Sequence, residues 1–116
     1  MANVKITWDN SNMDGASDVQ EVKIYRKSGD STSSFTDQDG SSTGSIEITA
    51  SDATTFVSGA QVLTSFSWPG SGNIADLASE YIDGAASDST TYTYGIFSSN
   101  ANGANIGPGA IRAITT

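Results

Sequence analysis

The chain has 116 residues, a common length for one domain with a single packed core. It contains no cysteine and no histidine, which excludes disulfides, thiolate chemistry and the triads of serine and cysteine hydrolases. Thirteen acidic and five basic residues give a net charge of −8, and a surface of that sign repels nucleic acid, so we expect no nucleic-acid partner. We also expect no membrane partner, because no apolar run is as long as a spanning helix requires and no secretory signal is recognisable at the first residues.

The N-terminal segment has the alternating pattern of a half-buried strand. Val4, Ile6 and Trp8 are separated by polar residues, and a polar turn with an Asp-Gly pair follows over residues 9–17.

The next predicted strand covers residues 19–27. Val22 and Ile24 are expected to point inward. The residues expected to face solvent or a groove are Lys23 and either Arg26 or Tyr25.

A long stretch over residues 28–79 separates this strand from the next one that the fold requires. Serine, threonine, aspartate and glycine dominate its first part, where we expect turns and one short strand at residues 34–36 around Phe35. Compact domains usually connect strands with much shorter segments, so the stretch counts as an enlargement.

The second part of this stretch contains two more alternating segments. Residues 45–49 and 62–68 are predicted strands, and Val62 and Phe66 are expected on the same face of the second. Between them, residues 50–59 form either a loop or a single helical turn that begins at Ser51 or Asp52.

The C-terminal part of the chain is predicted to be β-structure. A turn of helix at residues 74–78 is expected to lead into a strand at residues 81–83, and the last strand is expected at residues 111–116. The best-marked strand is residues 90–99, which ends at an Asn/Gly turn. One of its faces carries Tyr92, Tyr94, Ile96 and Ser98, and the other carries Thr91, Thr93, Gly95 and Phe97.

Several of these segments together resemble a fibronectin type III domain. They are Val4-x-Ile6-x-Trp8, Val22-x-Ile24-Tyr25-Arg26, Tyr81-x-Asp83, Thr90-x-Tyr92-x-Tyr94-x-Ile96-x-Ser98-x-Asn100-x-x-Gly103 and Ile111 to Thr116, in the order of the family's second, third, fifth, sixth and last strands. The resemblance implies an all-β fold: a two-sheet antiparallel β-sandwich of fibronectin III or immunoglobulin-like Greek-key type. Residues 1–116 would form one domain, with the family's first strand short or missing and an insertion between the third and fifth strands.

The resemblance also implies which residues form the core. Tyr92 matches the family's corner tyrosine, whose ring packs between the sheets and whose hydroxyl bonds a nearby backbone group, and Trp8 matches the central core residue. The core residues expected in this way are Trp8, Ile24, Tyr92, Tyr94 and Ile96.

Two pairs of residues are candidates for ligand contacts. Asp37 and Asp39, followed by Gly40, resemble a fragment of a calcium loop, but the full spacing is not met and an ordinary turn is the favoured interpretation, so no metal and no cofactor are expected. Phe66 and Trp68 either join the core, which we favour, or form an aromatic surface for a glycan or a protein.

Nothing in the sequence gathers groups for catalysis, since its carboxylates lie mostly in turn-like segments, and we expect no enzymatic activity. An acidic module of this family without an export signal is similar to bacteriophage virion proteins. The resemblance therefore implies a structural accessory protein, such as a capsid decoration, knob or tail-associated protein, made in the host cytoplasm and located in the virion. The alternative is a carbohydrate-binding or host-adhesion module.

The expected partners are other virion proteins of the capsid or tail, and copies of the chain itself. Without a first strand, the strand at Val4 would lie at a sheet edge and would offer unpaired backbone groups to a neighbour. The residues expected at this partner surface are Val4, Lys5, Lys23, Arg26 and Lys27.

Overall fold

The structure is a computed structural model that describes residues 2–8, 21–37, 45–67, 79–99 and 105–116. These residues form seven strands, one α-helix and one short 3₁₀ helix. In chain order they are β1 (Ala2–Thr7), β2 (Glu21–Ser28), η2 (Thr32–Ser34), β3 (Ile46–Ile48), α1 (Ala50–Val57), β4 (Gln61–Ser67), β5 (Glu80–Ala86), β6 (Thr91–Ser99) and β7 (Asn105–Thr115).

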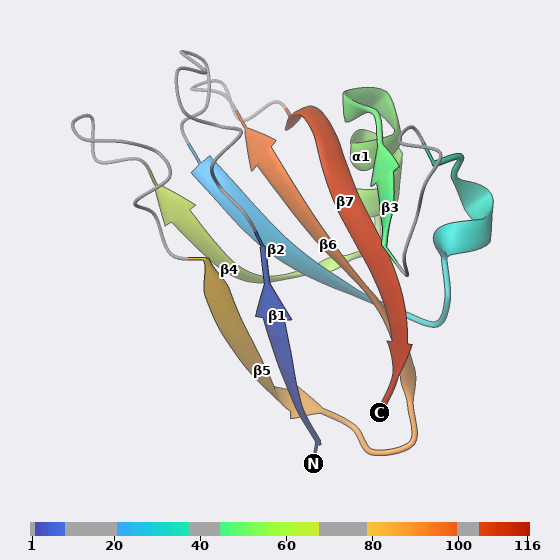
Figure 1. Ribbon diagram of the computed structural model, residues 1–116, viewed down its shortest axis with the longest axis vertical. Coiled ribbons are helices and arrows are strands. Elements are labelled where there is room, and N and C mark those ends of the chain that lie inside the picture. Colours follow the sequence, from blue (N-terminus) through green and yellow to red (C-terminus); the bar gives the residue numbers. More distant parts are fainter. Residues whose placement is uncertain (1, 9–20, 38–44, 68–78, 100–104) are drawn as a thin grey trace.

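The strands form two antiparallel sheets that pack face to face (Figure 1). The smaller sheet pairs β1 with β5, and the larger sheet has the order β3-β7-β6-β2-β4. The chain crosses between the sheets after β1, before β5 and after β5. The predicted all-β, two-sheet antiparallel sandwich is therefore confirmed.

The main core lies between the sheets, and period-two alternation explains its membership. β6 is the central strand of the larger sheet and directs Tyr92 and Tyr94 toward β1 and β5, where Val4 and Ile6 meet them. Ile24 on β2 is fully buried in the same cluster.

A second cluster covers the opposite face of the larger sheet. Phe56 of α1 packs on Phe97 of β6, with ring centroids 5.6 Å apart, and Tyr25 packs on Phe97 at 5.7 Å. Tyr25 was one of the residues expected to face solvent or a groove, but it is only 7% exposed. It is buried because α1 adds a layer that the sequence did not reveal (Figure 1).

Helix α1 is longer than the loop or single turn predicted for this segment. Its eight residues begin after Thr49, whose hydroxyl accepts a hydrogen bond from the Asp52 backbone N–H at 3.0 Å. The N-cap is therefore Thr49 and not Ser51 or Asp52, and the helix buries Ala53 and Phe56 on one face.

The strand predicted at residues 34–36 is not formed, and the 3₁₀ helix η2 ends at Ser34, the first of these residues. The Asp30 carboxylate accepts hydrogen bonds from the backbone N–H and the hydroxyl of Thr32, at 2.9 and 2.6 Å. Such a local side-chain bond favours a turn at the start of η2.

The prediction that Val62 and Phe66 lie on the same face of β4 is wrong for Val62. The ladder between β2 and β4 shifts register, so that Ile24 lies opposite Thr64 whereas the adjacent Tyr25 lies opposite Val62. The extra residue moves Val62 to the outer face, where it is 50% exposed, while Phe66 stays on the inner face. The turn predicted at residues 9–17 and the helical turn at 74–78 lie outside the described residues.

Candidate functional site

An open groove runs between β1 and the larger sheet, and we take it as the candidate functional site. Its volume is about 590 Å³. The lining residues come from β1 and the residue after it, from β3 and its flank, and from β6 and β7: Val4, Lys5, Ile6, Thr7, Trp8, Ser45, Glu47, Tyr94, Ile96, Gly109, Ala110, Ile111, Arg112 and Ile114.

The groove is bounded by the open edge of β1. Residues 4–8 all line it without a gap, although successive side chains point to opposite faces of the strand, so the edge itself faces the hollow. Among the described residues, the strand partner of β1 is β5. The groove therefore presents backbone as well as side chains.

The hydrogen-bond pattern identifies which backbone groups are open. The Trp8 N–H donates to the Ser79 carbonyl at 3.1 Å, so Trp8 belongs to a pair that bonds toward β5. Antiparallel ladders alternate between bonded and non-bonded pairs, and the N–H and C=O of Lys5 and Thr7 therefore point away from β5. No backbone group of the described segments pairs with these donors and acceptors at the groove.

The larger sheet supplies the other wall. Arg112 lies opposite Tyr94 in the β6–β7 ladder, so its side chain leaves β7 on the face turned toward β1. The same argument places Ile114, which lies opposite Tyr92, on that face. Apolar side chains thus form much of the wall, with one guanidinium among them.

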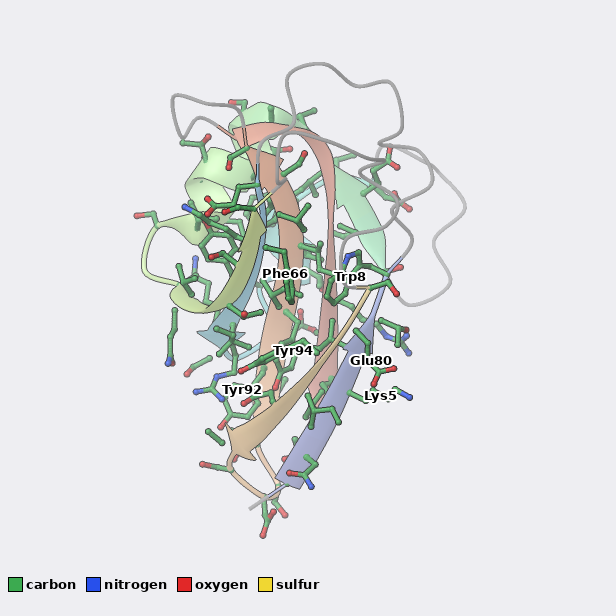
Figure 2. The ribbon with its side chains drawn as sticks, turned by 90° about the vertical axis from the view of Figure 1, so that its left-hand side faces the viewer. Lys5, Trp8, Phe66, Glu80, Tyr92 and Tyr94 are labelled. Carbon is green, nitrogen blue, oxygen red and sulfur yellow. The ribbon has the colours of Figure 1, made fainter. Side chains whose placement is uncertain are left out.

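Charge at the groove differs from charge over the whole protein. Lys5 pairs with Glu80 at 3.2 Å, and both side chains are more than half exposed (Figure 2). Arg112 is exposed and belongs to no ion pair in the described part of the chain. Glu47 is the acidic residue of the lining.

The other predicted basic residues do not join this surface. Lys23 pairs with Glu21 at 3.3 Å, and Lys27 donates to the Phe56 carbonyl at 3.1 Å on the outer face of the larger sheet. Because Arg26 lies on the inner face between them, the expected cluster is split between two faces.

Val4 was also expected at the partner surface, but its side chain does not lie there. Its side chain is 9% exposed and packs in the main core, so only its backbone is available at the sheet edge.

Arg26 takes part in a buried network between the sheets. Its guanidinium donates to Asp83 at 2.8 Å, Tyr94 donates its hydroxyl proton to the same carboxylate at 2.7 Å, and the Ala85 N–H donates to it at 3.1 Å. Burial raises the pKa of the Asp83 carboxyl, but the bonds from Tyr94 and Arg26 outweigh burial and hold that pKa below its ordinary value. Burial, followed by the bond to Asp83, raises the pKa of the Tyr94 hydroxyl.

This network was not predicted from the sequence. The signal was an aspartate at an inward position of a strand, since Asp83 lies opposite the buried Val4. A carboxylate there requires a partner of opposite charge, and the sequence alone does not show which arginine supplies it.

Tyr92 lies where the resemblance placed it. Its ring is buried, and its hydroxyl accepts a hydrogen bond from the Ser87 backbone N–H at 2.9 Å. Arg26 stacks over its ring at 4.8 Å, and Tyr94 packs beside it at 6.2 Å. Ile96 is partly buried against the same cluster.

Trp8 is not the central residue that was expected. It follows the last residue of β1 and is only partly buried, with its ring 5.8 Å from that of Phe66 at one end of the core (Figure 2). Its Nε1 is buried and has no hydrogen-bond acceptor among the described residues. The centre of the core is occupied instead by Ile24, Tyr92 and Tyr94.

The two ligand candidates are only partly described. Phe66 packs on Trp8 and the main core, while Trp68 lies outside the described residues. Asp37 accepts a hydrogen bond from the Glu47 N–H at 3.2 Å, and Asp39 also lies outside. Within the described ranges, no group of three or more acidic residues is placed to hold a metal ion.

Comparisons with known proteins identify no relative of the chain. No protein-family model matches the chain, and no significant match was found among curated proteins or solved structures. In the described segments, no helix is long and apolar enough to cross a membrane. The described part of the chain is a two-sheet β-sandwich in which β1 pairs with β5 on one side and borders the groove on the other.

Proposed function

We propose that the chain is a non-enzymatic structural accessory protein of a bacteriophage particle that binds other virion proteins. The single observation that carries the binding part is the open edge of β1 beside a preformed groove. An unpaired strand edge offers a row of hydrogen-bonding groups to another chain, and natural proteins usually protect such edges.

The family part of the proposal rests on the sequence resemblance and is supported by two structural features. The strands form an antiparallel sandwich, and Tyr92 bonds a backbone group five residues upstream, as corner tyrosines do in such sandwiches. The particle part rests on the acidic composition and on the likeness of such modules to virion proteins.

The burial and hydrogen bonding of the Asp83 carboxylate support the proposal that the chain is not an enzyme. Asp83 is 2% exposed and accepts three hydrogen bonds, so it is not available to exchange a proton with a substrate. A sequence without histidine and cysteine lacks the commonest bases and nucleophiles.

Particles purified from the source test this proposal. We expect mass spectrometry to detect the chain in particles banded on a density gradient, and the recombinant protein to co-sediment with particles that lack it. A chain found only in the unassembled fraction, and never with particles, would refute the virion assignment.

A further inference from the structure

We propose that the groove beside β1 binds an extended segment of a different protein chain, which adds a strand to β1 and places a carboxylate against Arg112. The inference rests on the proposed function, since the partner would be a virion protein, and it names the chemistry by which that partner is recognised. Three properties of the groove support it.

The first property is the main-chain edge. The N–H and C=O groups of Lys5 and Thr7 point into the groove and are spaced as in any strand, every second residue. An incoming extended segment satisfies these groups by forming a ladder, whereas a helix cannot satisfy them in this way. The occupant is therefore an extended segment of about the length of β1, which has six residues.

The second property is the apolar wall behind that edge. A strand added to β1 alternates its side chains, so every second one enters the hollow between β1 and β7. There it meets Ile6 from β1, Ile96 from β6 and Ile114 from β7. The inward residues of the occupant are accordingly apolar, apart from the one that reaches Arg112.

The third property is charge. Two of the five basic residues of a chain with a net charge of −8, Lys5 and Arg112, line this groove. Lys5 pairs with Glu80 and Arg26 pairs with Asp83, whereas Arg112 forms no ion pair within the described ranges. An acidic side chain on the inward face of the occupant supplies the missing partner.

The same charges argue against a second copy of the chain as the occupant. The β1 segment, Ala-Asn-Val-Lys-Ile-Thr, contains no acid, so pairing two β1 strands would bring Lys5 toward the basic groove of the other copy. A lysine on an edge strand is a recognised obstacle to self-pairing, and two chains of net charge −8 repel each other.

The test uses synthetic peptides and the full chain. The probe is an acetylated, amidated eight-residue peptide in which valine alternates with threonine and glutamate replaces one inward valine, prepared with glutamate at each inward position in turn. The control peptides carry lysine in place of glutamate. Binding is followed by NMR of the ¹⁵N-labelled protein, through shifts and hydrogen-exchange protection of the Lys5 and Thr7 amides.

Two variants at Thr7 separate the contribution of the backbone N–H to binding from effects on the stability of the fold. Thr7→Pro removes an N–H that does not bond β5, and proline is tolerated on an edge strand at such a position, so the fold should persist. Thr7→Ala changes the same side chain and keeps the N–H. We expect Thr7→Pro to weaken binding by about tenfold or more and Thr7→Ala to leave it within about twofold, since one lost hydrogen bond is worth about that factor.

A second variant tests the charge. Arg112→Glu should lose the preference for the glutamate peptide and acquire a preference for the lysine peptide. Equal binding of both peptides to the wild-type chain, protection at amides other than Lys5 and Thr7, or equal binding by both Thr7 variants would overturn the proposal. So would a self-associated wild-type protein, seen by sedimentation, that Thr7→Pro converts to a monomer.

The results distinguish this inference from the proposed function. If the chain is present in particles but no peptide binds, the added-strand inference fails and the virion assignment stands. If the peptide binds as described but the chain is never found in particles, the docking surface stands and the virion assignment fails.

Discussion

Asp83 is the residue on which the contact between the two sheets is centred. It belongs to β5 in the smaller sheet, while its partners Arg26 and Tyr94 belong to β2 and β6 in the larger one. A buried carboxylate without partners would cost several kcal/mol, so the three residues depend on one another. Tyr92 extends the group by holding the Arg26 guanidinium over its ring.

Replacing Asp83 by Asn should destabilise the protein by about 3 to 5 kcal/mol, because it leaves the Arg26 guanidinium without its counter-charge in a largely buried place. The pKa of Asp83 is lower in the folded protein, so its contribution is fully present above the unfolded pKa of about 3.9 and is lost as the pH falls through the folded value. Urea unfolding at a series of pH values measures both effects. The difference between wild type and Asp83→Asn should therefore shrink below about pH 4.

The control for this prediction is Glu80→Gln on the same strand. Glu80 pairs with Lys5 on the exposed side, and such surface pairs are worth about 0 to 1 kcal/mol. A difference between wild type and Asp83→Asn that stays constant from pH 7 to pH 3, or one no larger than that of Glu80→Gln, would contradict the role assigned to Asp83.

At the scale of elements, the strands were predictable where alternation was regular. The pattern of Tyr92, Tyr94 and Ile96 was confirmed because β6 pairs without interruption over most of its length. Prediction failed where a local event overrode the pattern, such as the register shift that turns Val62 outward. The open edge of β1 was also expected. The role proposed for Arg112 was not, because it depends on β1 and β7 lining the same groove although they are far apart in sequence, and no local pattern encodes that contact.

The helix α1 illustrates how a local hydrogen bond, the N-cap at Thr49, helps to determine where an element forms. Eight residues are too few for a stable isolated helix, so α1 depends on its cap and on burying Phe56. Thr49→Ala should lower the free energy of unfolding by about 1 kcal/mol, because the Asp52 N–H loses its acceptor. Thr55→Ala is the matched control, since Thr55 is exposed within the helix and alanine favours helix more than threonine. A loss for Thr55→Ala as large as for Thr49→Ala would show that the cap is not the cause.

On the scale of the whole molecule, the protein has three layers: the β1–β5 sheet, the five-stranded sheet and the layer of α1 (Figure 1). Two separate apolar clusters hold these layers together, one on each face of the larger sheet. The outer cluster requires a close approach between aromatic rings and backbone. A Cβ on Gly95 would lie 2.7 Å from Phe97 and 2.8 Å from Phe56, and a Cβ on Gly109 would overlap the Phe97 ring.

The glycine at 109 therefore sets the position of the outer layer, and Gly109→Ala should destabilise the protein by about 1 to 3 kcal/mol through overpacking. Gly84→Ala is the matched control, because a Cβ there meets only the Asn3 side chain, at an ordinary 3.5 Å, and should be neutral or slightly stabilising. Phe97→Leu in the Gly109→Ala background makes room for the new methyl group, so the double variant should lose less than the sum of the two single losses. Strictly additive losses in urea unfolding would mean that Gly109 is required by the β7 backbone and not by the ring that α1 packs against.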